Sequence, residues 1–386
     1  MALMSLGAAV YSYFSTPTAR PRPRRCILPF RAAASPAALD RRRRPQNVAG
    51  DFFVGEQSKI QLLFLFLQQQ ELCLTAARCL PFHGFIPSAA PRRPPLHRLP
   101  DLPMDGAASV AWLWLTLPSR AGMQEVFKRV DGKAAVAAQP NSEEERTKAL
   151  QALLSCPTSS IHTEKPPKDM LKVQNMFPLP IDDNLLPGIY LCGYNSEDSY
   201  GATSYLVIHP QGNILIDSPR YTPKLANNIE KLGGARYMFL THIDDVADHR
   251  KWTEQLKCKR IIHSGDVEET TADVEWKLEG NGPWNIGTDF ELIHTPGHTP
   301  GSVCLYCKPL KVLFTGDHVA NSEESDDLNL FLMYSKQSVS LQLESIRKLL
   351  EVEFEWLLPG HGYRIKYKDV QAKNAAIESL LANYTS

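Results

Sequence analysis

The sequence has no net charge and no long hydrophobic run. Basic and acidic residues number 42 each among 386 residues, so nothing in the overall charge attracts nucleic acid or an anionic membrane. Its longest apolar runs, near residues 60 and 110, are well short of the roughly 20 residues that a membrane-spanning helix needs. We therefore expect a soluble protein with a small-molecule substrate and with neither nucleic acid nor a membrane as partner. The oligomeric state stays open.

Cysteine is scarce, and lysine is absent from the first 50 residues. The eight cysteines do not follow a secreted disulfide framework, which is typical of a reducing compartment. Residues 1–50 hold nine arginines and a single acidic residue, Asp40. This composition predicts a transit peptide, and its early Ser, Thr and Ala content favours the chloroplast stroma over the mitochondrion. A disordered basic tail is the alternative.

Periodicity is missing from residues 51–123, which are rich in proline and arginine, so we expect a disordered or irregular segment there. Strand-like and helical patterns alternate from residue 168 to residue 386, and they predict a folded domain. Strands mixed with helices and joined by tight turns favour a layered α+β sandwich with helices outside. The strand candidates are ATSYLVIH, ILID, YMFLTH, RIIHS, FELIHT, SVCLYC, VLFTGD and WLLPGH.

Four of these apolar runs lead to a side chain that can bind a metal. His242 follows YMFLT, His298 follows ELIHTPG, Asp317 follows VLFTG and His361 follows WLLPG. Neighbouring strands lie about 4.8 Å apart, so side chains at several strand ends can meet at one point. Imidazole and carboxylate together favour zinc, iron or manganese. The pattern predicts a metal site.

The stretch THIDDVADH, residues 241–249, adds a dense group of further candidates. Together with TPGHTPGS, FTGDH and LPGHG, it resembles the metallo-β-lactamase superfamily over roughly residues 185–365. The resemblance implies an αβ/βα four-layer sandwich, with two β-sheets and helices outside. It also implies one or two divalent metal ions at one edge, zinc or iron, with manganese possible.

Matching the family's motifs position by position assigns a ligand set. The resemblance implies a first metal held by His242, Asp244 and His298, a bridging Asp317, and a second metal held by Asp248, His249 and His361. Asp248 and Asp317 are the implied catalytic residues.

The sequence departs from the family's His-x-His-x-Asp-His pattern at two points. Asp244 stands where the second histidine is usual, and the Asp248–His249 pair comes two residues late. Asp245 fits a helix N-cap as well as it fits a ligand. Asp217 matches the family's early aspartate, which supports the site through hydrogen bonds.

Histidines and cysteines outside these motifs are not expected to bind metal. His263, His294 and His318 lie at strand ends and are left out of the ligand set, and His209 is expected to be solvated. Cys304 and Cys307 lie three apart within a strand pattern, so they point to opposite faces and are expected in the core.

Hydrolysis is the first functional hypothesis. A metal-activated water would attack a thioester, lactone or related carbonyl substrate, as in glyoxalase II. The alternative is an iron-dependent oxidoreductase of the flavodiiron or persulfide dioxygenase kind, because the Asp244 carboxylate shifts metal preference toward iron. A metal-binding scaffold without turnover is a third reading.

Residues 124–165 resemble the later part of a single-cluster ferredoxin module that ends in Cys156-Pro157. Such a cluster needs four thiolates, and the upstream Cys-x-x-Cys-x-x-Cys run is missing. The nearest upstream cysteines, Cys73 and Cys79, are six apart in unpatterned sequence. We therefore expect a metallohydrolase of a plant plastid type that carries a truncated ferredoxin-like remnant, and no iron-sulfur cluster. Whether residues 51–123 belong to the working protein stays open.

Overall fold

The computed structural model describes residues 52–54, 126–130, 133–321 and 327–384. The transit peptide predicted for residues 1–50 lies outside this part of the chain, as does nearly all of the irregular segment predicted for residues 51–123. Within the described part, every helix is too short or too polar to span a membrane.

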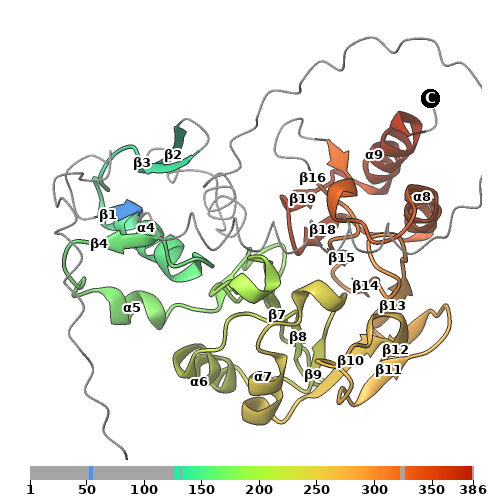
Figure 1. The fold of residues 1–386 in the computed structure, drawn as a ribbon, viewed down its shortest axis with the longest axis horizontal. Coiled ribbons are helices and arrows are strands. Elements are labelled where there is room, and N and C mark those ends of the chain that lie inside the picture. The colour runs from blue at the N-terminus through green and yellow to red at the C-terminus, as the bar shows by residue number, and fades with distance from the viewer. Residues whose placement is uncertain (1–51, 55–125, 131–132, 322–326, 385–386) are drawn as a thin grey trace, which may run out of the picture. The chain divides into compact units, whose positions relative to one another are not determined.

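A seven-stranded mixed sheet forms one half of the main domain (Figure 1). Its strands run in the order β11-β10-β9-β8-β7-β6-β5, antiparallel from β5 to β8 and parallel from β8 to β11. Their bounds are β5 Leu179–Pro180, β6 Ile189–Leu191, β7 Tyr205–Val207, β8 Ile214–Ile216, β9 Tyr237–Phe239, β10 Lys259–His263 and β11 Trp276–Leu278.

The other half is a six-stranded sheet in the order β12-β13-β14-β15-β18-β19. All its neighbours are antiparallel except β15 and β18, which are parallel. Their bounds are β12 Trp284–Ile286, β13 Phe290–His294, β14 Val303–Cys307, β15 Val312–Gly316, β18 Trp356–Pro359 and β19 Ile365–Lys366. A separate short pair joins β16 Ala320–Asn321 to β17 Leu328–Asn329.

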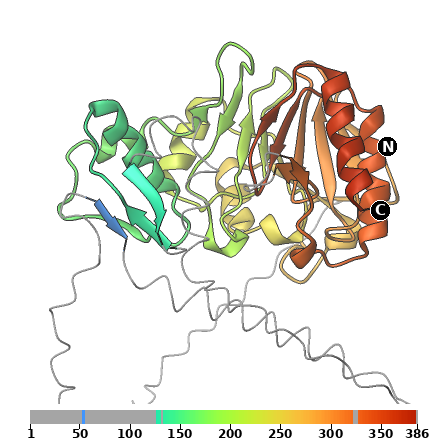
Figure 2. The same ribbon diagram turned by 90° about the horizontal axis from the view of Figure 1, so that it is seen from above.

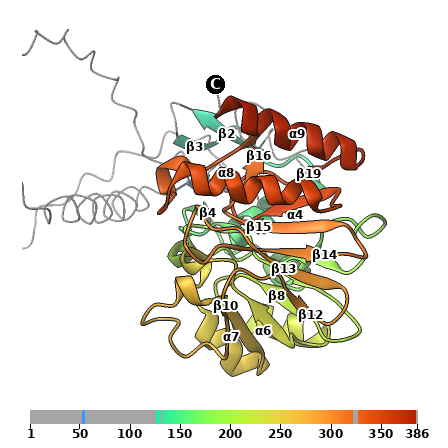
Figure 3. The ribbon, with the colours of Figure 1, turned by 90° about the vertical axis from the view of Figure 1, so that its right-hand side faces the viewer.

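Helices cover the outer faces of the two sheets. Figure 3 shows α8 (Val339–Lys348) and α9 (Val370–Asn383) beside the six-stranded sheet, and α6 (Pro223–Lys231) and α7 (His249–Leu256) on the opposite side. The side chains of Thr222, Ser338 and Asp369 cap α6, α8 and α9 by accepting a backbone N–H. Figure 2 gives the view from above. The arrangement confirms the predicted αβ/βα sandwich.

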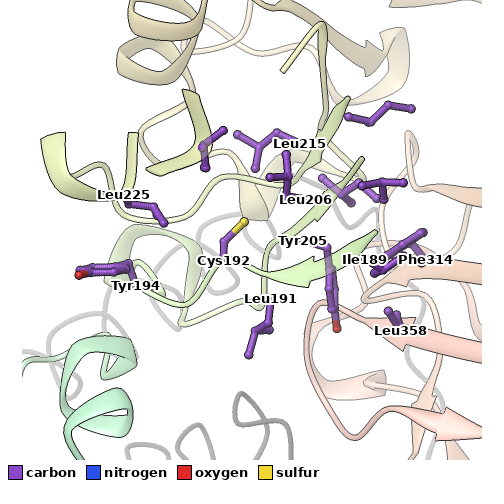
Figure 4. Packing of buried hydrophobic residues seen from close by; sticks show 14 of the residues in the cluster. Ile189, Leu191, Cys192, Tyr194, Tyr205, Leu206, Leu215, Leu225, Phe314 and Leu358 are labelled. Atoms are coloured by element: carbon purple, nitrogen blue, oxygen red, sulfur yellow. The ribbon is translucent and has the colours of Figure 1, made fainter. Parts of the chain in front are cut away.

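The core between the sheets follows the two-residue period of a strand. Leu292 packs in the cluster shared by both sheets, whereas its neighbour Ile293 packs in the cluster under α8 and α9. Figure 4 shows Tyr205 of one sheet beside Phe314 of the other, and their ring centroids lie 5.3 Å apart. The Tyr205 hydroxyl also donates to the Pro359 carbonyl at 2.7 Å. The sheets are thereby fixed close to the strand ends that carry the candidate ligands.

Cys304 and Cys307 are both buried free cysteines, in these two different clusters. The prediction that they belong to the core is confirmed.

A smaller group of elements precedes the sandwich. Strand β1 (Phe52–Val54) pairs with β4 (Ile161–Thr163), and β2 (Phe127–Val130) pairs with β3 (Lys133–Val136). Helix α4 (Glu143–Ser155) is capped by Ser142, whose hydroxyl accepts from the Glu145 N–H, and a short helix α5 spans Met170–Gln174. The structure thus places one strand, β1, inside the segment that was expected to be irregular.

Candidate metal centre

The candidate centre lies where strand ends of the two sheets meet. Strand β9 of the seven-stranded sheet leads to His242, while β13, β15 and β18 of the six-stranded sheet lead to His298, Asp317 and His361. Glycines make this approach possible. A Cβ on Gly316 would lie 2.5 Å from the Thr241 hydroxyl, and one on Gly360 would lie 2.8 Å from an Asp245 oxygen.

Asp317 is the hub of the cluster. Its two carboxylate oxygens lie 2.6 and 2.7 Å from Nδ1 of His361. Its Oδ2 lies 3.6 Å from Nε2 of His242 and 3.8 Å from Nε2 of His298. All four residues are at least 90% buried. The structure therefore brings together the four candidate ligands at strand ends, which are up to 119 positions apart in the sequence.

Asp244 joins the same cluster from the short 3-10 helix η2, Ile243–Asp245. Its Oδ2 lies 3.9 Å from Nε2 of both His242 and His298. The other oxygen, Oδ1, accepts a hydrogen bond from the Lys336 ammonium at 2.5 Å. The aspartate at the usual histidine position is thus placed where a ligand would be.

Asp245 is the residue whose role the sequence left undecided. Its side chain is fully buried, and neither carboxylate oxygen has a hydrogen-bond partner. One oxygen lies 3.9 Å from Nδ1 of His242. Two overlapping ligand groups result, one of His242, Asp244 and His298 and one of His242, Asp245 and Asp317, each with ligand atoms within 4.8 Å of one another. The Asp-Asp doublet in the sequence was the signal for the second group.

The structure brings neither Asp248 nor His249 to this cluster, and this corrects their predicted place. Asp248 accepts hydrogen bonds from the Tyr221 N–H and the Lys251 ammonium, both at 2.7 Å. Both ring nitrogens of His249 are also engaged. Its Nε2 donates to the Thr270 carbonyl and its Nδ1 accepts from Arg260, each at 3.1 Å. The two extra residues move the pair to the start of α7, beyond the turn that carries Asp244 and Asp245.

The electrostatics of the cluster suit a cation. Burial lowers the pKa of a histidine, but the Asp245 and Asp317 carboxylates outweigh it and raise the pKa of His242 to about 10. Burial likewise opposes charge on His361, yet Asp317 raises its pKa to about 9. Burial and the neighbouring His242 lower the pKa of His298 to about 4. Protonated imidazoles thus balance the carboxylates, and a metal ion competes with protons for such atoms.

The donors present fit a divalent metal. Nε2 of His242, Nε2 of His298 and both oxygens of Asp245 are buried without a hydrogen-bond partner. Buried polar atoms are nearly always paired, because an unpaired one loses its hydration without compensation. Imidazole nitrogens and carboxylate oxygens are ligands of zinc, iron and manganese. Metal ions held by the two ligand groups would give these atoms partners.

Asp217 supports the cluster as predicted, through Thr241. Its carboxylate accepts from the Thr241 N–H at 2.8 Å and from the Thr241 hydroxyl at 3.1 Å, and that hydroxyl lies 3.0 Å from Nδ1 of His242. Asp217 adopts a positive φ of 57°, a conformation that costs free energy for a residue other than glycine. The chain of contacts fixes the orientation of the His242 ring.

Asp266 ties the two ligand-bearing loops together, and sequence reasoning missed it. It is 3% exposed, and its carboxylate accepts from the Ile243 N–H at 3.0 Å and from the Thr299 hydroxyl and the Gly301 N–H at 2.6 Å each. Ile243 follows His242 and Thr299 follows His298 in the sequence. No motif marks this residue, because its three donors come from remote loops.

Replacing Asp266 with alanine should lower the free energy of unfolding by about 3 kcal/mol, because three buried donors would lose one charged acceptor. Urea unfolding followed by circular dichroism measures the change. Asp289→Ala is the matched control, since Asp289 accepts from Thr288 and lies 2.9 Å from His209 near the surface. A loss no larger than that of the control would contradict the role given to Asp266.

The remaining histidines lie outside the two ligand groups. His263 and His294 stack with centroids 4.1 Å apart, and each contacts a backbone carbonyl, of Gly280 and Pro300 respectively. His318 is buried beside Asp317. His209 was expected to be solvated, but it lies against Asp289 and Phe290 with little exposure.

Comparison with known proteins gives two family matches. Residues 199–361 match the metallo-beta-lactamase superfamily, and residues 120–163 match the 4Fe-4S single cluster domain of ferredoxin I. In the second range the sequence contains one cysteine, Cys156, whose buried sulfur lies 3.5 Å from the Thr158 and Ser160 hydroxyls. The absence of a cluster stays a prediction.

Curated relatives are named as hydrolases. The probable metallo-hydrolase YybB of Bacillus subtilis is 24% identical over 162 residues, which are 38% of this chain and 73% of the relative. The acyl-coenzyme A thioesterase MBLAC2 of Homo sapiens is 35% identical over 82 residues, 20% of this chain and 27% of that protein. The chain thus spans about a quarter of the length of this thioesterase.

Solved structures with a similar fold include DIM-1 metallo-beta-lactamase, at 21% identity and a TM-score of 0.40, covering 50% of this chain and 93% of that one. ST1585 from Sulfolobus tokodaii has 17% identity and a TM-score of 0.37, covering 52% of this chain and 86% of that one.

Proposed function

Residues 199–361 form a domain of the metallo-β-lactamase superfamily, and on this premise we propose that the chain is a metal-dependent hydrolase of thioester, lactone or related carbonyl substrates. The observation that carries the proposal is the pair of overlapping ligand groups around His242. Thioesters are the first substrate class to test, because relatives of this chain are named acyl-coenzyme A thioesterases.

Two sets of residues in this chain would each hold a divalent metal ion. His242, Asp244 and His298 would hold one divalent ion, and Asp245, Asp317 and His361 would hold a second. A bound divalent ion lowers the pKa of a water molecule and polarises the substrate carbonyl. Asp248 and His249 take no part, since their polar atoms are engaged at α7.

We assign Asp245 as the general base that accepts the proton of the attacking water. Burial and the neighbouring Asp317 raise its pKa well above the usual value, which makes its carboxylate a stronger acceptor for a proton. Because neither oxygen is hydrogen-bonded, one oxygen can serve as a ligand while the other accepts the proton. Asp317 holds the His361 ring through Nδ1, and the tie between Asp217, Thr241 and His242 keeps a second ring fixed.

Oxidoreduction at iron is the second candidate, and one observation favours it. The carboxylate of Asp244 lies beside His242 and His298, where an imidazole is usual in the family. Carboxylate oxygen is a harder ligand than imidazole and shifts preference from zinc toward iron or manganese.

Metal analysis combined with a substrate panel tests the proposal. We expect the purified full chain to carry one or two equivalents of metal and to hydrolyse at least one thioester or lactone. His298→Ala should lose metal and lower kcat/KM by about a hundredfold or more, because a ligand and its charge stabilisation are lost. Iron with dioxygen consumption and no hydrolysis would favour the oxidoreductase instead. Bound metal with no turnover of any kind would favour a metal-binding scaffold without catalytic activity.

A further inference from the structure

Three large apolar side chains stand exposed in a row next to the candidate centre. Leu332, Met333 and Tyr334 form the short helix η4, and they are 37%, 75% and 53% exposed. The other exposed large apolar residues in the described part of the chain, Leu171, Met176, Leu185 and Tyr200, are not consecutive in the sequence. We call Leu332–Tyr334 the apolar ridge. An exposed apolar cluster beside a reactive centre points to a ligand that covers it.

The apolar ridge is fastened at both ends to candidate ligands. On one side the Lys336 N–H donates to the His298 carbonyl at 2.6 Å, and the Lys336 ammonium donates to Asp244. On the other side the Phe331 ring stands edge-on to the His361 ring, with centroids 6.5 Å apart. Within this span the Ser335 hydroxyl donates to Gln342 of α8 at 3.0 Å. The exposed side chains are therefore held at a fixed place beside the metal cluster.

We propose that the apolar ridge binds the acyl chain of the substrate, so that the enzyme prefers medium-chain acyl groups over short ones. The inference rests on the proposed hydrolase function and names its substrate class. Lys336 is a positioning residue in this arrangement, because it joins the ridge to Asp244 and places its own charge beside the carboxylate. The anchoring to His298, Asp244 and His361 favours a chain attached to the reacting carbonyl over a separate macromolecule.

Chain-length dependence is the expected signature. Each methylene removed from water is worth about fourfold in affinity, but a ridge on an open surface covers one side of a chain only. For S-octanoyl-N-acetylcysteamine against the S-butanoyl ester, we expect about tenfold higher kcat/KM, carried by KM. In the variant Met333→Ser/Tyr334→Ser, the preference should fall below about threefold, because the octanoyl ester loses more apolar contact than the butanoyl ester.

Leu171→Ser is the matched control. Leu171 is 61% exposed on α5, so the substitution removes a similar exposed apolar side chain away from the ridge and should keep the wild-type preference. Metal content and thermal unfolding verify that each variant is intact. Should the double variant fail to fold, Met333→Ser alone, at the most exposed position, replaces it.

Binding of two unreactive thioethers separates this inference from the proposed function. Calorimetry with S-octyl- and S-butyl-N-acetylcysteamine requires no turnover, and the octyl compound should bind about tenfold more tightly to the wild-type chain but not to the double variant. If neither thioester is hydrolysed but this binding difference holds, hydrolysis fails and the acyl-binding ridge stands. An unchanged chain-length preference in the double variant overturns the ridge proposal. So does a wild-type dimer that the double variant dissociates, because the ridge would then cover a second copy.

Discussion

Asparagine in place of Asp317 should lower kcat/KM for the best substrate by about three orders of magnitude, equivalent to about 4 kcal/mol of transition-state stabilisation. Asp317 contacts three imidazoles, those of His361, His242 and His298. The amide carries no negative charge, so it loses its attraction for a cation and weakens its hold on the His361 ring. Steady-state kinetics with the best substrate of the panel measures the effect.

Asp289→Asn supplies the control for this substitution, since it makes the same chemical change at a carboxylate beside His209, outside the ligand groups. It should retain wild-type kcat/KM. Circular dichroism must show that the Asp317 variant is folded. Activity within tenfold of wild type in a folded Asp317→Asn protein would remove Asp317 from the mechanism.

Metal affinity should separate Asp245 from Asp248. Asp245→Asn should weaken metal binding by about a hundredfold or more, at least as much as the 10–100-fold that outer-shell changes cost, because it removes the charge of a buried carboxylate whose oxygens have no other partner. Asp248→Asn should leave metal affinity unchanged, since Asp248 binds Tyr221 and Lys251. Competition with a chromogenic chelator measures both values without relying on turnover.

The opposite result for the two aspartates would reverse the assignment of the metal ligands. If Asp248→Asn lost the metal and Asp245→Asn kept it, metal binding would require α7 to rearrange, and the family's motif would apply despite the two extra residues. Zinc and manganese should each be titrated, because the extra carboxylates of this centre favour harder ions.

Short apolar runs that end at turn residues allowed most of the fold to be predicted from the sequence. All eight predicted strand runs overlap a strand of the two main sheets, between β7 and β18, because apolar residues bounded by turn signals carry a clear pattern. The strands β6 (Ile189–Leu191) and β12 (Trp284–Ile286) were not predicted from the sequence. Strand β1 was not predicted either. Its partner β4 lies more than a hundred positions further along.

The candidate site was likewise predicted only in part from the sequence. His242, His298, Asp317 and His361 were identified from the sequence, because each follows an apolar strand through a short turn and so has its place set by local structure. The sequence assigned Asp248 to the site and left the role of Asp245 open, whereas the structure turns Asp245 inward, because the backbone between His242 and α7 decides which carboxylate faces the cluster. Asp266 left no trace in the sequence, since its role depends on loops brought together only by folding.

The sequence by itself determined the layered architecture and the strand ends that carry metal-binding side chains, because periodicity and turn residues act over a few neighbouring positions. Only the tertiary structure decided which aspartates of the THIDDVADH stretch face His298 and His361, and which segment lies over them. The orientation of these aspartates depends on the approach of two sheets whose strands are distant in the chain. It also depends on the hydrogen bonds that Tyr221, Lys251 and Arg260 donate to Asp248 and His249, which lie outside the cluster.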